Sequence, residues 1–105
     1  MGLEREVVFN GPVPAWSVVA AHLTDVQMRM IDGQLAAPEE QPHEPWHELR
    51  VARDGEMLTI RRLADRVVLV GWAEPSPARQ RLTEDLIRAF HEAASEHNYT
   101  SGNDS

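Results

Sequence analysis

The sequence predicts a small α+β domain, a two-layer sandwich in which a mostly antiparallel sheet of about four to six strands carries two helices on one face. Three observations predict it. Short runs of alternating apolar residues end at Asn-Gly or Asp-Gly pairs, which are turn signals of antiparallel strands. Two other segments have apolar residues at helical spacing. The length of 105 residues allows one such domain, expected over residues 1–97.

The chain is expected to begin with a strand and a helix. Residues 4–9 form a short run with an apolar end that stops at Asn10-Gly11-Pro12, as a strand followed by a turn would. Pro14 is acceptable in the first turn of a helix. A helix of about three turns is then predicted from the helical spacing of four residues: Trp16, Val19, Ala20 and Leu23.

Residues 26–36 are compatible with either a helix or a hairpin. Met28 and Met30 alternate as they would in a strand, but they also fit an extension of the preceding helical stripe. The pair Asp32-Gly33 favours the hairpin, because it is a hairpin turn pair and glycine is unfavourable inside a helix.

A three-stranded meander is expected over residues 46–73, which read WHELRVAR, a turn, EMLTIRRL, a second turn and RVVLVGWA. The first of these strands, beginning at His47, is expected at an edge of the sheet, with Trp46 filling the sheet end. A two-residue turn at Asp54-Gly55 fixes the register of the first two strands. The predicted pairs are Arg53 with Glu56, Ala52 with Met57, Val51 with Leu58, Leu49 with Ile60, and Glu48 with Arg61.

The third strand of the meander is apolar on both faces, which is typical of a central strand covered twice. Val67 and Leu69 lie on one side and the alternate residues on the other. The helices can cover one face, and a partner subunit would cover the second. We therefore expect a homodimer or another protein partner, and a possible interaction surface formed by Met57, Val68, Val70 and Trp72.

The last element is a helix that begins with Ser76 as its N-cap and Pro77 at the first helical position. Its apolar stripe consists of Leu82, Leu86, Ala89, Phe90 and Ala93. The stripe predicts a helix that ends near Ser95, and the polar segment 98–105 is expected to be a disordered tail.

Composition argues against several classes of function. The formal net charge of -7 disfavours binding to a phosphate backbone. The chain has no cysteine, and all ten basic residues are arginine, so thiolate and lysine chemistry are excluded. No apolar run is long enough for a signal peptide or a membrane span. We expect a cytoplasmic protein that does not bind membranes.

The stretch HEPWH at residues 43–47 matches the letters of a zinc metalloprotease motif. That motif requires a helix, which places both histidines on one face. Pro42 and Pro45 prevent a helix here, and no third ligand is evident. The sequence therefore predicts no catalytic residue, no metal site and no cofactor, although a small metal-binding protein or enzyme that uses His43 and His47 remains an alternative.

The function that these observations favour is protein–protein interaction, as a homodimer or as an adaptor, immunity or chaperone-like factor, rather than catalysis. No family motif is present. Weak RNA binding is a further alternative, disfavoured by the net charge and by the predicted pairing of two arginines with glutamates. It would use the arginines that crowd the meander, namely Arg50, Arg53, Arg61, Arg62 and Arg66.

Overall fold

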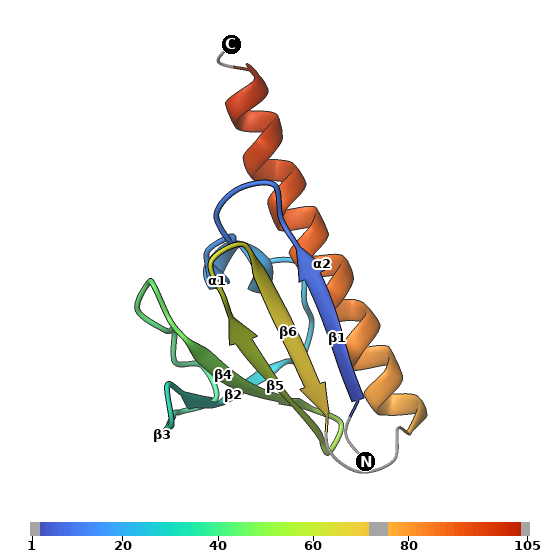
Figure 1. Cartoon of the computed structure of the whole chain (residues 1–105). Helices are drawn as coiled ribbons and strands as arrows, with labels where there is room; N and C mark the ends of the chain where they lie inside the picture. Colours follow the sequence, from blue (N-terminus) through green and yellow to red (C-terminus); the bar gives the residue numbers. More distant parts are fainter. Residues whose placement is uncertain (1–2, 72–75, 104–105) are drawn as a thin grey trace.

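The structure, a computed structural model, describes the backbone of residues 3–71 and 76–103. It confirms the predicted α+β class, since six strands form one antiparallel sheet accompanied by two helices (Figure 1). The predicted order of elements is confirmed as well. The elements are β1 (Leu3–Val8), α1 (Trp16–Ala20), β2 (Gln27–Ile31), β3 (Gln34–Leu35), β4 (Glu48–Arg53), β5 (Glu56–Arg62), β6 (Arg66–Gly71) and α2 (Pro77–Asn103).

The strands lie in the order β1-β6-β5-β4-β2-β3, and each neighbouring pair is antiparallel. β1 and β3 are therefore the edges of the sheet. The expectation that the strand after His47 is an edge strand was wrong, because β2 returns from α1 and pairs with the free side of β4. The long helix α2 runs beside β1 (Figure 1), contacts β1 and β5, and is itself contacted by α1.

Two Asp-Gly pairs form the hairpin turns. Asp54 and Gly55 have φ angles of 53° and 80°, and Asp32 and Gly33 have φ angles of 49° and 83°. Two successive residues with positive φ form the tight turn whose twist matches that of antiparallel strands. The first turn produces every pair predicted for β4 and β5. The second turn shows that residues 26–36 form a hairpin rather than a helix.

One face of the sheet carries the core. We call it the inner face, and it includes Val67 and Leu69 of β6; the outer face includes Val68 and Val70. Apolar residues of both helices join the same buried cluster, and the predicted stripe of α2 is fully buried. The sheet contributes Val7, Met28, Leu49, Val51, Leu58, Ile60, Val67 and Leu69 to this cluster.

A β-bulge interrupts β2. Met28 pairs with Val51 and Met30 pairs with Arg50, so Arg29 is an extra residue that faces no partner in β4. The bulge sends the two methionines to opposite faces: Met28 is buried in the core, and Met30 lies on the outer face, half-buried. Simple alternation, which places both methionines on one face, was wrong here, because alternation assumes an unbroken ladder.

The helices differ in length from the predictions. α1 has five residues rather than about three turns. After Ala20 the N–H groups of His22 and Leu23 donate to carbonyl groups three residues earlier, and Asp25 has a φ of 59°, which turns the chain into β2. α2 continues to Asn103 instead of ending near Ser95. Its start is as predicted, since Ser76 Oγ accepts a hydrogen bond from the Arg79 N–H at 3.1 Å.

Candidate functional site

A row of directly paired residues crosses the outer face of the sheet. Leu35 pairs with Met30, Met30 with Arg50, Arg50 with Thr59, and Thr59 with Val70. Residues paired in this way stand next to one another on one face. The row therefore joins the β2–β3 hairpin to the middle of the sheet.

The end of this row near the hairpin is exposed and apolar. Met57 of β5 is 46% exposed and Leu35 of β3 is 88% exposed, which is unusual for side chains of this size. Between them lies an open hollow of about 410 Å³. We call this region the Met57 surface, and it consists of Arg29, Met30, Leu35, Ala36, Arg50 and Met57.

Three of the four residues of the surface expected from the sequence lie within the described structure. Met57, Val68 and Val70 lie on the outer face, as predicted, and Trp72 lies outside the described residues. Val70 is only 4% exposed and Val68 is half-buried, so this chain already covers most of the β6 side. The accessible apolar surface therefore extends from Met57 toward β2 and β3 rather than toward β6.

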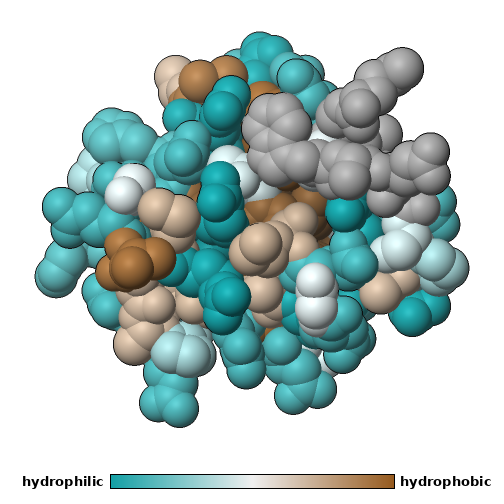
Figure 2. Space-filling model, turned by 90° about the horizontal axis from the view of Figure 1, so that it is seen from below, coloured by the Kyte–Doolittle hydropathy of each residue, from teal (hydrophilic) through white to brown (hydrophobic). Residues whose placement is uncertain are grey.

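Few large hydrophobic side chains are exposed in the described part of the chain. The face of the molecule seen from below is mainly hydrophilic, with hydrophobic residues in small separate groups (Figure 2). Besides Met57 and Leu35, the exposed large hydrophobic residues of the described part of the chain are Val8, Val18 and Leu63. None of these three lines the hollow of the Met57 surface.

The two arginines of the Met57 surface differ from most others in the chain. Among the described residues, neither Arg29 nor Arg50 has a carboxylate partner. Arg50 is held in place by its Nε, which donates to Thr59 Oγ1 at 3.3 Å, and Thr59 is only 3% exposed. The other four arginines of the meander form ion pairs, namely Arg53 with Asp85, Arg61 with Glu48, Arg62 with Glu44, and Arg66 with Glu6 and Asp65. That pairing leaves little free positive charge for RNA.

Sequence reasoning did not assign Arg29, Met30 and Leu35 to the site. Leu35 follows a hairpin turn in a strand of two residues, which is too short to show a period. Met30 reaches the outer face through the bulge at Arg29, and no pattern in the sequence QMRMI reveals a bulge. The feature of the sequence that pointed to this surface was the presence of methionines, whose side chains adapt to different binding partners.

The HEPWH stretch forms a structural junction. One carboxylate oxygen of Glu44 accepts the N–H of Trp16 at the start of α1 at 3.1 Å, and the other pairs with Arg62 at 3.2 Å. The Arg62 guanidinium lies 5.4 Å from the ring centre of Trp46, which is fully buried at the sheet end as predicted. The glutamate that a metalloprotease would use to activate water is therefore bound to α1 and to β5.

Asp32 fixes the other end of this junction. Its Oδ1 accepts the backbone N–H groups of His47 at 2.7 Å and of Glu48 at 2.9 Å. The hydrogen bond from Glu48 is the main cause that lowers the pKa of Asp32, and the hydrogen bond from His47 adds to it. One carboxylate thus connects the β2–β3 turn to the start of β4.

The histidines do not form a metal centre in the described part of the chain, where no three His, Asp or Glu side chains are placed to hold an ion. His43 and His47 are exposed, in a segment that is not helical. His22 lies near two carboxylates of α2, but its Nδ1 faces Glu92 at 2.9 Å and its Nε2 faces Glu96 at 2.7 Å. Because opposite ring nitrogens face the two carboxylates, the three groups do not converge on one point.

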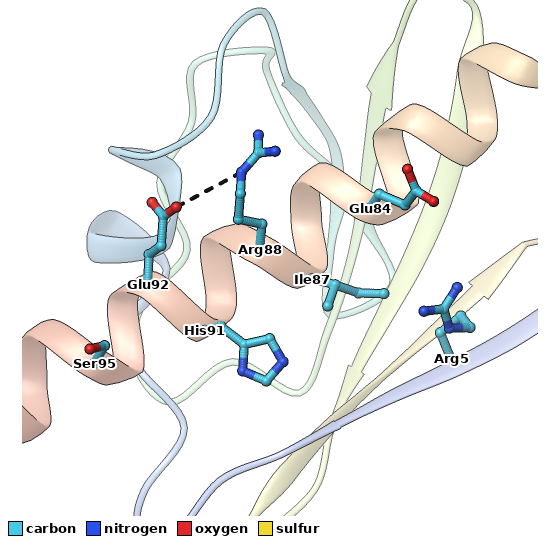
Figure 3. Close-up of a pocket in the computed structure, with 7 residues that line it drawn as sticks. All are labelled: Arg5, Glu84, Ile87, Arg88, His91, Glu92 and Ser95. Carbon is cyan, nitrogen blue, oxygen red and sulfur yellow. Dashed lines mark ion pairs between the residues drawn. The ribbon is translucent and has the colours of Figure 1, made fainter.

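A second hollow, of about 520 Å³, lies between β1 and α2. Arg5 borders it from β1, while Ile87 and His91 extend from α2 toward the strand (Figure 3). Arg88 and Glu92 at its rim are paired at 3.9 Å, and Arg88 also pairs with Asp85 at 2.9 Å. Both signs of charge are present around this hollow, so it favours no particular class of ligand.

The chain shows no helix long and apolar enough to cross a membrane among the residues that the structure describes. Comparison with protein-family models, with curated proteins and with solved structures finds no match. The features of the Met57 surface itself are therefore the basis for a functional proposal.

Proposed function

We propose that this protein is a protein–protein interaction module that contacts its partner through the Met57 surface. The observation that supports it most is an exposed apolar hollow on the outer face of the sheet, bordered by two arginines that have no carboxylate partner within residues 3–71 and 76–96. Methionine and arginine are enriched at protein interfaces because methionine adapts its shape and arginine combines an apolar stem with several donors.

A homodimer is one form of this proposal, and a different protein partner is the other. The apolar outer side of β6 is now a weaker reason to propose a homodimer, because Val70 is already buried within one chain. Leu35 and Met57 now supply the apolar area that a partner would cover. The proposal therefore rests on the β2–β3 side of the sheet.

Site-specific photo-crosslinking tests where the partner binds. A photoreactive phenylalanine analogue replaces Met57 in one variant and Leu63 in a matched control, because Leu63 is similarly exposed, at 53%, but lies outside the Met57 surface. We expect a single crosslinked product with the partner from position 57 and none from position 63. Excess unlabelled wild-type protein should reduce the amount of this product. Mass spectrometry then identifies the adduct as a second copy of the chain or as another protein.

Reconstitution with the purified partner completes the test. A Met57→Glu substitution places a charge in the contact and is expected to weaken binding by about tenfold or more, whereas Leu63→Glu leaves it within about twofold. Equal adducts from both positions, or equal affinity of both variants, would contradict the proposal.

A further inference from the structure

We infer that the Met57 surface recognises an acidic segment of a partner protein, in which a carboxylate lies beside apolar side chains. This inference rests on the proposed function and specifies the chemistry of the partner. It follows from the charges around the hollow, from the way Arg50 is held, and from the apolar side chains between the two arginines.

Arg29 and Arg50 differ from most arginines of the chain in their ion pairing. Among the described residues, six of the ten arginines form ion pairs with carboxylates of this chain. In a chain of net charge -7, carboxylates are abundant, yet Arg29 and Arg50 border the same hollow without one among the described residues. Two such cations at the border of an apolar hollow would favour a carboxylate from outside, although Asp25 and Asp54 line a neighbouring hollow that shares Arg29 and Met57.

The side chain of Arg50 is restrained by a hydrogen bond within the sheet. Its Nε donates to the buried Thr59 hydroxyl at 3.3 Å, which restrains the side chain of this half-buried arginine. The terminal N–H groups of the Arg50 guanidinium have no hydrogen-bond partner within the described part of the chain. A restrained guanidinium loses less conformational entropy when it binds a carboxylate, and its planar fork matches the two carboxylate oxygens.

The apolar side chains define the rest of the ligand. Leu35 and Met57 are exposed and border the same hollow as the arginines, and Met30 lies between Leu35 and Arg50 in the paired row. A free anion would leave these side chains in water, whereas a segment with apolar residues next to its carboxylate would cover them. A second copy bound about a two-fold axis through the hollow would bring arginine against arginine, so charge favours a different, acidic partner.

A random peptide library, selected on the immobilised full chain, tests this inference without a known partner. The enriched peptides are synthesised, and their affinity is measured by fluorescence anisotropy for the wild type and for three variants. Arg29→Gln with Arg50→Gln removes both charges, and Thr59→Val removes the bond that holds Arg50. Arg81→Gln is the matched control, because Arg81 is an exposed arginine of α2 that does not border the hollow.

We expect enriched peptides that place Asp or Glu beside apolar residues. Their binding should weaken about tenfold or more in the double variant, measurably in Thr59→Val, and by less than about twofold in Arg81→Gln. Added salt should weaken binding to the wild type more than to the double variant.

The other outcomes separate this inference from the proposed function. Peptides without acidic residues that bind the double variant normally but lose binding in Met57→Glu would overturn the acidic segment and leave the interaction surface in place. Peptides insensitive to Met57→Glu as well, or no enrichment at all, would overturn both. A labelled single-stranded RNA that displaces the peptides and binds more tightly through the same arginines would overturn the acidic partner in favour of nucleic acid.

Discussion

At the scale of single residues, Asp32 shows how one side chain can determine both a turn and a junction. Its positive φ lets the β2–β3 hairpin close, and its carboxylate holds the N–H groups of His47 and Glu48. The turn was predictable, because Asp-Gly is a local signal. The two hydrogen bonds were not, because they join residues distant in the sequence, and the same is true of Glu44 and Trp16.

Replacing Asp32 tests its two roles together. Asp32→Ala removes the acceptor and disfavours positive φ, and we expect it to lower the free energy of unfolding by about 1–3 kcal/mol, with the exposure of the site favouring the lower end. Asp32→Asn tolerates positive φ and keeps one acceptor oxygen, so its effect should be smaller. Urea denaturation of both variants provides the measurement, and two equal losses would mean that the hydrogen bonds to β4 contribute nothing.

The same residue scale gives a pH dependence. Asp85 accepts a hydrogen bond from Arg53 at 2.7 Å, which is the main cause that lowers its pKa, and Arg88 adds to the effect. A carboxylate with a lowered pKa stabilises the fold above its unfolded pKa, and this contribution is lost as the pH falls through the folded pKa. Asp85→Asn should therefore destabilise the protein at pH 7 and make little difference near pH 2, as measured by thermal unfolding across pH. A loss that is the same at both pH values would show that the ion pair is not its cause.

At the scale of elements, local patterns predicted a sheet of four to six strands, the order of the elements along the chain, and the register of β4 with β5. Alternation succeeded where ladders are regular, and it failed at β2, where Arg29 is an extra residue. The length of α1 was also missed, because the return of the chain into β2 ends the helix, and β2 pairs with β4 far along the sequence. Both errors have a tertiary cause that a local pattern does not contain.

A deletion tests the bulge directly. Removing Arg29 should convert β2 into a regular strand, with Met28 and Ile31 still inside and Met30 still outside. We expect a cooperatively folded protein whose stability falls only modestly, because the lost contacts are those of Arg29, including its carbonyl bond to the Ala36 N–H.

The control deletes a residue from a regular strand. Removing Thr59 shifts one half of β5 by one residue and so moves its apolar side chains to the wrong face. Circular dichroism and urea unfolding should then show a protein that does not fold cooperatively. Equal damage from the two deletions would contradict the bulge.

At the scale of the whole molecule, the sequence predicted an interaction surface near β6, and the exposed apolar residues Met57 and Leu35 extend toward the β2–β3 hairpin. The apolar character of β6 is largely accounted for within one chain, since Val70 is buried. The accessible surface depends on the β2–β3 hairpin and its bulge, which bring residues from three further strands beside Met57. A site assembled across strands in this way follows from topology rather than from any one segment.

The oligomeric state has a simple test in the untagged protein. If the partner is a different, acidic protein, sedimentation velocity should show a monomer over a wide range of concentrations, with or without added zinc. A dimer that dissociates in Met57→Glu but not in Leu63→Glu would identify a second copy as the partner, which would contradict the acidic-segment inference.

The central claim is that the Met57 surface is where a partner protein binds, and one comparison of affinities tests it most directly. Isothermal titration calorimetry of the partner identified by crosslinking is carried out with the wild type, with Met57→Glu and with Leu63→Glu. The proposed interface predicts a loss of about tenfold or more for Met57→Glu and an unchanged affinity for Leu63→Glu. Unchanged affinity for Met57→Glu would contradict the claim and place the contact elsewhere on the molecule.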